Sequence, residues 1–217
     1  MPLKDKLRGY AREVLGFEFV GFVLADDFRS YVEDWAKTII ALGLETWDDS
    51  FDMAIFRVKN GKLDVYYVYE AILARKALKL CLYLRDLGFK AEHVPYSLPL
   101  KQVAVKAGAG CYGKNSLIIN PQYGSRIRFT SVVTDADVEA DAPFEGDLCG
   151  ECDACMRACP LQTITEPYKI NARRCVNSLV PPSRDVDPDV LEVAPKLLRR
   201  PTDNSMILCS LCQAVCP

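Results

Sequence analysis

The sequence has little histidine, little net charge and no long apolar run. His93 is its only histidine, and 27 lysines and arginines nearly balance 29 aspartates and glutamates, for a net charge of -2. Such a chain lacks the basic surface that nucleic-acid phosphates call for. No apolar stretch reaches the roughly 18 residues of a membrane span, and the start shows neither a signal-peptide core nor a twin-arginine pair. These absences predict a cytoplasmic protein with no nucleic-acid or membrane partner.

Cysteine is also scarce over most of the chain. Only Cys81 and Cys111 lie in the first 148 residues, whereas the other eight of the ten cysteines lie in the last 69. In a reducing compartment clustered cysteines are more often metal ligands or redox groups than disulfides. The distribution predicts a distinct C-terminal metal-binding unit. The single histidine disfavours a Rieske centre or a histidine-rich zinc site within it.

The spacing of the eight cysteines indicates two [4Fe–4S] clusters. Residues 149–160 read C-x2-C-x2-C-x3-C-P, in which the fourth cysteine of such a run ligates the other cluster. Residues 209–217 read C-x2-C-x3-C-P and lack one cysteine, which Cys175 supplies. The crossed arrangement assigns a first cysteine group to one cluster (Cys149, Cys152, Cys155 and Cys216) and a second cysteine group to the other (Cys159, Cys175, Cys209 and Cys212). Structural zinc, which also uses C-x2-C pairs, is the alternative.

The first 135 residues mix amphipathic patterns with β-rich runs, which predicts an α/β or α+β domain. Cys81 lies within a predicted helix and is expected to be a buried core residue. We expect His93 to be a surface or turn residue. The predicted helices are 3–15, 27–42, 65–87 and a short one after Pro99, and the predicted strands are 17–24, 53–58, 91–94, 116–120 and 127–134, with Asn60-Gly61 as a hairpin turn.

An acidic stretch separates this region from the cysteines. Residues 135–147 hold six acids in thirteen positions and almost no bulky apolar side chain, which is typical of a solvated linker. We therefore divide the chain into an α/β domain over residues 1–140 and a cysteine-rich domain over residues 141–217.

A glycine-rich loop follows the pattern G-x-G-x-x-G at Gly108, Gly110 and Gly113. A dinucleotide site would place this pattern after a strand and before a helix. Here it follows a helix-like stretch and leads into β-rich sequence, so a nicotinamide-linked oxidoreductase is disfavoured.

The surrounding residues resemble a known family. Ala107-Gly-Ala-Gly110-Cys-Tyr-Gly113-Lys114-Asn115, Tyr123-Gly124-Ser125 and Val133-Thr134-Asp135 are similar to the core of the epoxyqueuosine reductases, which are relatives of the reductive dehalogenases. The cysteine block agrees, including Asn171-Ala-Arg173-Arg174-Cys175 and the closing Gln213-Ala-Val-Cys216-Pro217. The match covers about residues 98–217.

The resemblance implies a nitroreductase-like α/β N-terminal domain followed by a mostly helical, ferredoxin-like module with two [4Fe–4S] clusters. It also implies a base-off cobalamin between them, with a protein electron donor such as a ferredoxin or flavodoxin. Cys111 is expected to line a pocket or lie in the core. The residues expected at or near the corrinoid are Gly108, Gly110, Gly113, Lys114, Asn115 and Ser125, and the alternative is a tight turn that needs glycine for its backbone alone.

The sequence departs from the family in two places. Relatives carry a proton-donating aspartate shortly before the glycine-rich loop, whereas residues 93–99 contain no acid. The chain also stops before the family's tRNA-binding helical repeats, which predicts a small substrate. Tyr96 and Tyr112 are the candidate proton donors, as tyrosine is in dehalogenases. Two hypotheses follow: a reductase whose clusters feed a corrinoid, or less favourably a flavin, and a ferredoxin-like carrier with no cofactor in its N-terminal domain.

Overall fold

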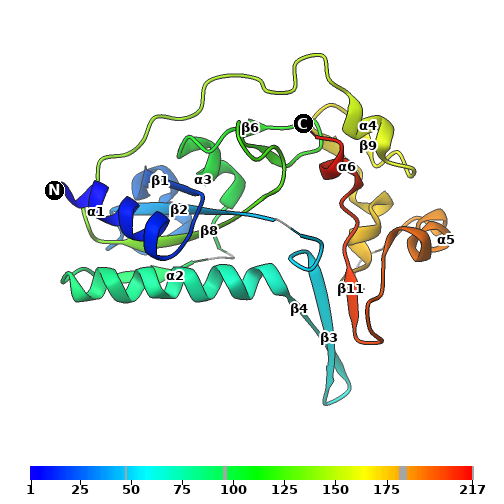
Figure 1. The fold of residues 1–217 in the computed structure, drawn as a ribbon, viewed down its shortest axis with the longest axis horizontal. Helices are drawn as coiled ribbons and strands as arrows, with labels where there is room; N and C mark the ends of the chain where they lie inside the picture. The colour runs from blue at the N-terminus through cyan, green and yellow to red at the C-terminus, as the bar shows by residue number, and fades with distance from the viewer. Residues whose placement is uncertain (47, 95–96, 181–184, 217) are drawn as a thin grey trace.

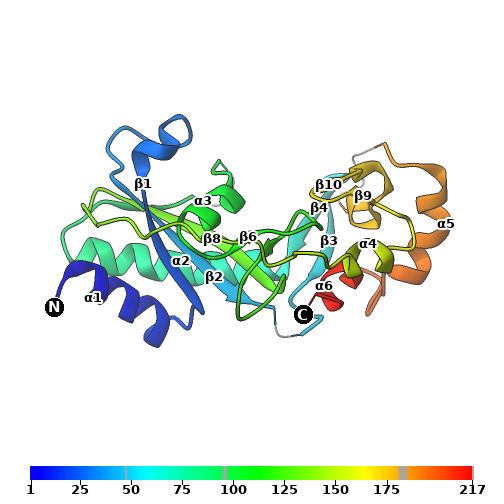
Figure 2. The same cartoon turned by 90° about the horizontal axis from the view of Figure 1, so that it is seen from above.

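The computed structural model describes residues 1–46, 48–94, 97–180 and 185–216. An α/β part comes first in the chain, and a cysteine-rich unit, residues 148–217, lies beside one end of it (Figures 1 and 2). Among the described residues, no helix is both long and apolar enough to cross a membrane.

A four-stranded antiparallel sheet forms the centre of the α/β part. Its strand order is β1 (Phe19–Leu24), β2 (Thr38–Glu45), β8 (Ile127–Thr134) and β5 (Ala91–His93). In β2 every residue from Thr38 to Leu44 is buried, since the strand is central and both faces of the sheet are covered.

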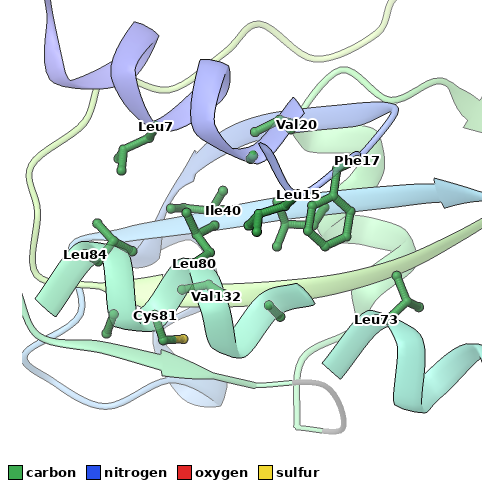
Figure 3. Close-up of a cluster of buried hydrophobic side chains, with 14 of the residues drawn as sticks. Leu7, Leu15, Phe17, Val20, Ile40, Leu73, Leu80, Cys81, Leu84 and Val132 are labelled. Carbon is green, nitrogen blue, oxygen red and sulfur yellow. The ribbon is translucent and has the colours of Figure 1, made fainter. Parts of the chain in front are cut away.

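Helices cover the two faces of this sheet. α2 (Val68–Asp86) and α1 (Leu3–Gly9), which continues as a π-helical turn over Tyr10–Val14, pack on one face. Figure 3 shows the shared core there, with Leu7, Ile40, Leu80 and Val132 pointing toward one another. α3 (Leu100–Lys106) packs on the other face through Val103, against Ile39 and Val133.

The helix predicted over residues 27–42 is wrong. A short 3-10 segment covers Ala25–Tyr31, and the buried strand β2 begins at Thr38. Aromatic and aliphatic residues at helical spacing produced the prediction. A strand buried on both faces is continuously apolar, so its periodicity cannot distinguish it from a buried helix.

A long hairpin joins the sheet to the start of α2. β3 (Met53–Lys59) pairs with β4 (Lys62–Tyr67), and Asn60 and Gly61 turn between them with positive φ values of 51° and 72°, which confirms the predicted turn. The predicted helix over 65–87 is confirmed from Val68 onward. Its first three residues instead extend β4, because Val65, Tyr66 and Tyr67 pair with β3 and their types favour strands.

The cysteine-rich unit consists of short elements around a small core of its own. Leu161, Val176, Val190, Ala194 and Leu198 form that core. The elements are α4 (Ala154–Ala158), the hairpin of β9 (Ile164–Glu166) and β10 (Lys169–Ile170), 3-10 turns over Ala172–Arg174 and Val176–Leu179, α5 (Pro188–Leu197), β11 (Ser205–Ile207) and α6 (Leu211–Ala214).

One strand of the cysteine-rich unit belongs to a sheet of the α/β part. β11 pairs antiparallel with β3, so that the second sheet has the order β11, β3, β4. The two parts are therefore joined by backbone hydrogen bonds as well as by the connecting chain.

The acidic stretch is fastened at two points, rather than solvated throughout. Ala136 and Val138 are buried in the core. Asp141 accepts hydrogen bonds from Arg8 at 2.7 Å and from the Phe22 amide at 3.0 Å, and it pairs with Lys4 at 2.8 Å. Burial acts to raise the pKa of Asp141, but these bonds outweigh it and hold the pKa below its usual value.

Candidate metal centre and neighbouring cavity

Each cysteine run forms a tight loop that leads into a short helix. In the first run the Cys152 amide donates to the Cys149 carbonyl at 2.8 Å, and α4 follows. In the second the Gln213 amide donates to the Ser210 carbonyl at 2.8 Å, at the start of α6. α4 and α6 pack against each other, so both runs are held at one place in the fold.

The structure brings the first cysteine group together around one cavity, the first thiol cavity. It has a volume of about 150 Å³ and is lined by all four cysteines, together with Lys114 and Asn115 from the glycine-rich loop. Cys152 is exposed and the other three are half-buried. The space between the thiols is therefore accessible from solvent.

The second cysteine group lines a separate cavity of about 60 Å³, the second thiol cavity. All four of its cysteines are half-buried, and Leu161, Val176 and Leu197 surround them with apolar side chains. Burial raises the pKa of Cys212 to about 12, with smaller contributions from neighbouring cysteines. Because the thiolate is the form that ligates metal, metal uptake at such a site releases protons.

Backbone amides point at sulfurs of both cysteine groups. The Lys114 amide donates to Cys149 Sγ and the Thr163 amide to Cys159 Sγ, each at 3.4 Å. Hydrogen bonds to sulfur are among the factors that set the potential of an iron–sulfur cluster. Among the described residues, no group of three or more His, Cys, Asp or Glu side chains is placed to hold a single metal ion.

The two remaining cysteines lie elsewhere. Cys81 lies on the buried face of α2 and is 5% exposed in the core, as expected (Figure 3). Burial raises the pKa of its thiol to about 11. Cys111 lies on β6 (Cys111–Tyr112), which pairs with β7 (Ile118–Ile119), and its half-buried sulfur accepts a hydrogen bond from the Leu148 amide.

The glycines of the loop are explained by close approaches of the backbone. Gly110 has a φ of +148°, and a Cβ there would lie 1.9 Å from the Ile119 carbonyl oxygen. Gly108 has a φ of +83°, and a Cβ would lie 2.7 Å from the Ala142 carbonyl oxygen. At Gly113 a Cβ would meet the Ile119 side chain at 2.6 Å. Gly108 and Gly110 thus meet the backbone demand of the turn alternative, whereas Gly113 is packed closely against a side chain.

The other expected corrinoid contacts face the cysteine loops or the interior. Lys114 donates through Nζ to the Gly150 carbonyl at 2.6 Å, and Asn115 through Nδ2 to the Cys212 carbonyl at 3.3 Å. Ser125 is 1% exposed, and its Oγ has no hydrogen-bond partner among the described residues. The loop thus holds the cysteine-rich unit against the α/β part.

A much larger cavity, of about 590 Å³, lies between the two parts. This large cavity was not predicted, because its residues come from distant segments. Its walls include Tyr69 and Ala74 of α2, His93 of β5, Lys101 of α3, Arg128 and Thr130 of β8, and Asp52, Asn177, Leu208 and Gln213.

His93 was expected at a surface or turn and instead lies half-buried at the end of β5, in the wall of the large cavity. Its Nε2 is 2.7 Å from Thr130 Oγ1, and burial lowers the pKa of the imidazole. Of the two candidate proton donors, Tyr112 is 39% exposed on β6 and is not among the residues that line this cavity. Tyr96 lies outside the described residues.

The large cavity borders the second cysteine group. Asn177 lines the cavity and makes two hydrogen bonds with Cys209, from Nδ2 to the carbonyl and from the Cys209 amide to Oδ1, both at 2.9 Å. A group bound in the cavity would therefore lie beside the second cysteine group.

Comparisons with known proteins agree with this architecture. Residues 148–217 match the family described as a 4Fe-4S double cluster binding domain. The epoxyqueuosine reductase of Listeria monocytogenes serovar 1/2a is 31% identical over an alignment of 254 residues, which covers 99% of this chain and 64% of that protein. That of Bacillus subtilis strain 168 is 35% identical over 117 residues, 54% of this chain and 28% of that protein. The chain thus spans less than two thirds of either relative.

Solved structures give the same result. A crystal structure of a selenomethionine-labelled epoxyqueuosine reductase matches 99% of this chain and 65% of that one, with a TM-score of 0.73 and 27% identity. At 24% identity, an epoxyqueuosine reductase with a modified tRNA-Tyr stem loop matches in fold, with a TM-score of 0.71 over 99% of this chain and 64% of that one. A reductive dehalogenase whose structure suggests a B12-dependent mechanism matches in fold at 16% identity, with a TM-score of 0.56 over 77% of this chain and 28% of that one.

Fold and cysteines together define a mixed α/β protein with an iron–sulfur binding unit. More particularly, the chain is similar to the epoxyqueuosine reductases over almost its whole length, which confirms the resemblance in its sequence.

Proposed function

We propose that the chain is a reductase that carries two [4Fe–4S] clusters, one in each thiol cavity. The first cysteine group would hold one cluster and the second group the other. The observation that carries the proposal is the gathering of the eight cysteines into two fours, each around one cavity. The same arrangement supports a division into an α/β domain, 1–140, and a ferredoxin-like module, 141–217.

The exposure of the two groups supports a direction for electron flow. Cys152 is exposed, so the cluster of the first group would accept electrons from a donor protein, such as a ferredoxin or flavodoxin. The second group borders the large cavity through Asn177, so its cluster would deliver them there.

The large cavity would hold the group that receives these electrons. Its walls combine apolar surface with a few polar groups, an arrangement typical of cofactor sites. A corrinoid there would be held by Tyr69, His93, Lys101 and Thr130, which line the cavity. When bound, it would supply a low-potential metal centre that reduces the substrate. The dehalogenase named for a B12-dependent mechanism supports this choice over a flavin.

We propose a small molecule as the substrate. One related structure holds a tRNA stem loop, but the net charge of -2 does not favour binding to nucleic acid. The acid-free stretch 93–99 also lacks the proton donor of the relatives that reduce epoxyqueuosine. Among the cavity residues, His93 is the one whose ordinary pKa lies near neutrality.

A ferredoxin-like electron carrier is the second candidate. The observation in its favour is the inward packing of the glycine-rich loop, which leaves none of the three glycines lining the large cavity. In this alternative the α/β part would serve to dock a partner.

Anaerobic purification followed by titration with cobalamin tests both candidates. On the two-cluster count the protein should contain about eight iron and eight acid-labile sulfide per chain, and zinc in their place would refute the central proposal. The reductase should bind cobalamin under reducing conditions and give a base-off spectrum. A protein with full iron that binds no cobalamin would favour the carrier.

A further inference from the structure

A buried ion pair lies where the α/β part meets the cysteine-rich unit. Arg128 of β8 donates through Nε to Asp52 Oδ1 at 3.1 Å and through Nη2 to Asp52 Oδ2 at 2.7 Å. Asp52 is 7% exposed and the Arg128 side chain 18%. This is a two-bond arginine–carboxylate contact, which fixes both partners in position.

Both members of the pair connect to the second cysteine group. Arg128 Nη2 also donates to Gln213 Oε1 at 3.1 Å, and Gln213 directly follows Cys212. The Asp52 carbonyl accepts from the Leu208 amide at 3.1 Å, and Leu208 directly precedes Cys209. Two of the four cysteines of this group thus adjoin residues that the ion pair holds.

Arg128 has no role as a free cation in the large cavity. Its guanidinium is engaged by Asp52 and Gln213 and lies against the ring of Tyr69, 5.7 Å from the centroid.

Charge at this position matters because both side chains of the pair are largely buried. Interactions between charges grow as the effective dielectric falls, and the potential of an iron–sulfur cluster depends on the net charge nearby. Reduction adds an electron, so a nearby positive charge favours the reduced cluster and a negative charge disfavours it.

We propose that Arg128 is a positioning residue that raises the reduction potential of the cluster at the second cysteine group. The carboxylate of Asp52 offsets part of the positive charge that Arg128 exerts on that cluster. The hydrogen bond from Arg128 to Gln213 holds the guanidinium beside the residue that follows Cys212. This inference rests on the proposed function, because it requires the two clusters.

Substitutions at the two ends of the pair test the proposal, since they break the same contact but leave opposite charges behind. Asp52→Asn leaves the guanidinium uncompensated, so the potential of the second cluster should shift positive. Arg128→Met leaves the carboxylate, so that potential should shift negative. A residue with a merely structural role would shift the potential in the same direction in both variants.

The measurement is an anaerobic redox titration of the holoprotein followed by electron paramagnetic resonance. Cys175→Ala identifies which signal belongs to the second cluster, and the other cluster should keep its potential in both charge variants. Arg128→Lys retains the charge and should keep the wild-type potential. Asp141→Asn removes a carboxylate that Arg8 and the Phe22 amide of β1 hold in the α/β part, and it should change neither potential.

Iron content separates the outcomes. Full iron with potentials that do not move, or that move in the same direction, would overturn this inference and leave the proposed function intact. A wild-type protein without iron would overturn both. Should Arg128→Met lose iron, Gln213→Glu provides the second test, because a carboxylate beside Arg128 should shift the same potential negative, and an unchanged value there would overturn the inference.

Discussion

The side-chain amide of Asn115 donates a hydrogen bond to the carbonyl oxygen of Cys212, with 3.3 Å between nitrogen and oxygen, across 97 positions of sequence. Asn115 is only 2% exposed, and its Oδ1 accepts from the Leu117 amide at 3.1 Å. One side chain of the glycine-rich loop thus fixes both its own turn and the second cysteine run.

Replacing Asn115 with Ala should speed the loss of iron from the second cysteine group. The change removes both hydrogen bonds and leaves half-buried partners unsatisfied, at a cost of about 1–3 kcal/mol. The rate of iron release to a chelator measures the effect. Asn204→Ala, at an exposed position, is the control, and equal release rates in the two variants would contradict the role given to Asn115.

Replacing Cys175 with Ala should remove one cluster and leave the other. Cys175 lines only the second thiol cavity, so iron should fall from about eight to about four per chain on the two-cluster count. Cys81→Ala is the matched control, because the Cys81 thiol is buried in the core on the inner face of α2. That variant should keep its iron and lose stability alone. If Cys175→Ala lost both clusters or neither, the assignment of ligands would be wrong.

Replacing Gly110 with Ala should destabilise the α/β part by at least about 3 kcal/mol, since the change combines an unfavourable φ with a steric clash. The new Cβ would lie 1.9 Å from a backbone oxygen at a φ of +148°. Denaturant unfolding gives the free energy. The control is Gly9→Ala at the end of α1, where a Cβ meets nothing within 4 Å and alanine should stabilise by about 0.5–1 kcal/mol. A Gly110→Ala protein of wild-type stability would refute the close approach.

Replacing Ala74 with Trp should abolish cobalamin binding without loss of iron. Ala74 lines the large cavity from α2, and the indole would fill space that a cofactor needs. Cobalamin titration and iron analysis of the same preparation provide the test. Leu78→Trp, one turn further along α2 at a position 52% exposed, is the control. Tight binding by Ala74→Trp would place the cofactor elsewhere.

The cysteine pattern could be interpreted from sequence because its information is local. The two runs need only a few residues to form a loop and a short helix, and their cysteines, with Cys175, line two cavities. The hairpin turn at Asn60-Gly61 was predictable for the same reason, since its positive φ values suit those two residues.

The large cavity could not be predicted, because it exists only once the sheet has formed. Tyr69, Arg128 and Gln213 are far apart in sequence and meet through the pairing of β8 in the sheet and the docking of α6. One signal was available: Arg128 is the charged residue in the otherwise uncharged strand Ile127–Thr134. A charged side chain there calls for a buried partner, which proved to be Asp52.

The pairing of β11 with β3 has a consequence for the order in which the protein matures. β11 ends at Ile207, two residues before Cys209. The strand that leads into Cys209 and Cys212 therefore pairs with a hairpin that lies more than a hundred residues earlier in the sequence. During synthesis the hairpin leaves the ribosome first. The folded α/β part therefore positions the second cysteine group through the pairing of β11 with β3. We expect iron to enter that group only after the first half of the chain has folded.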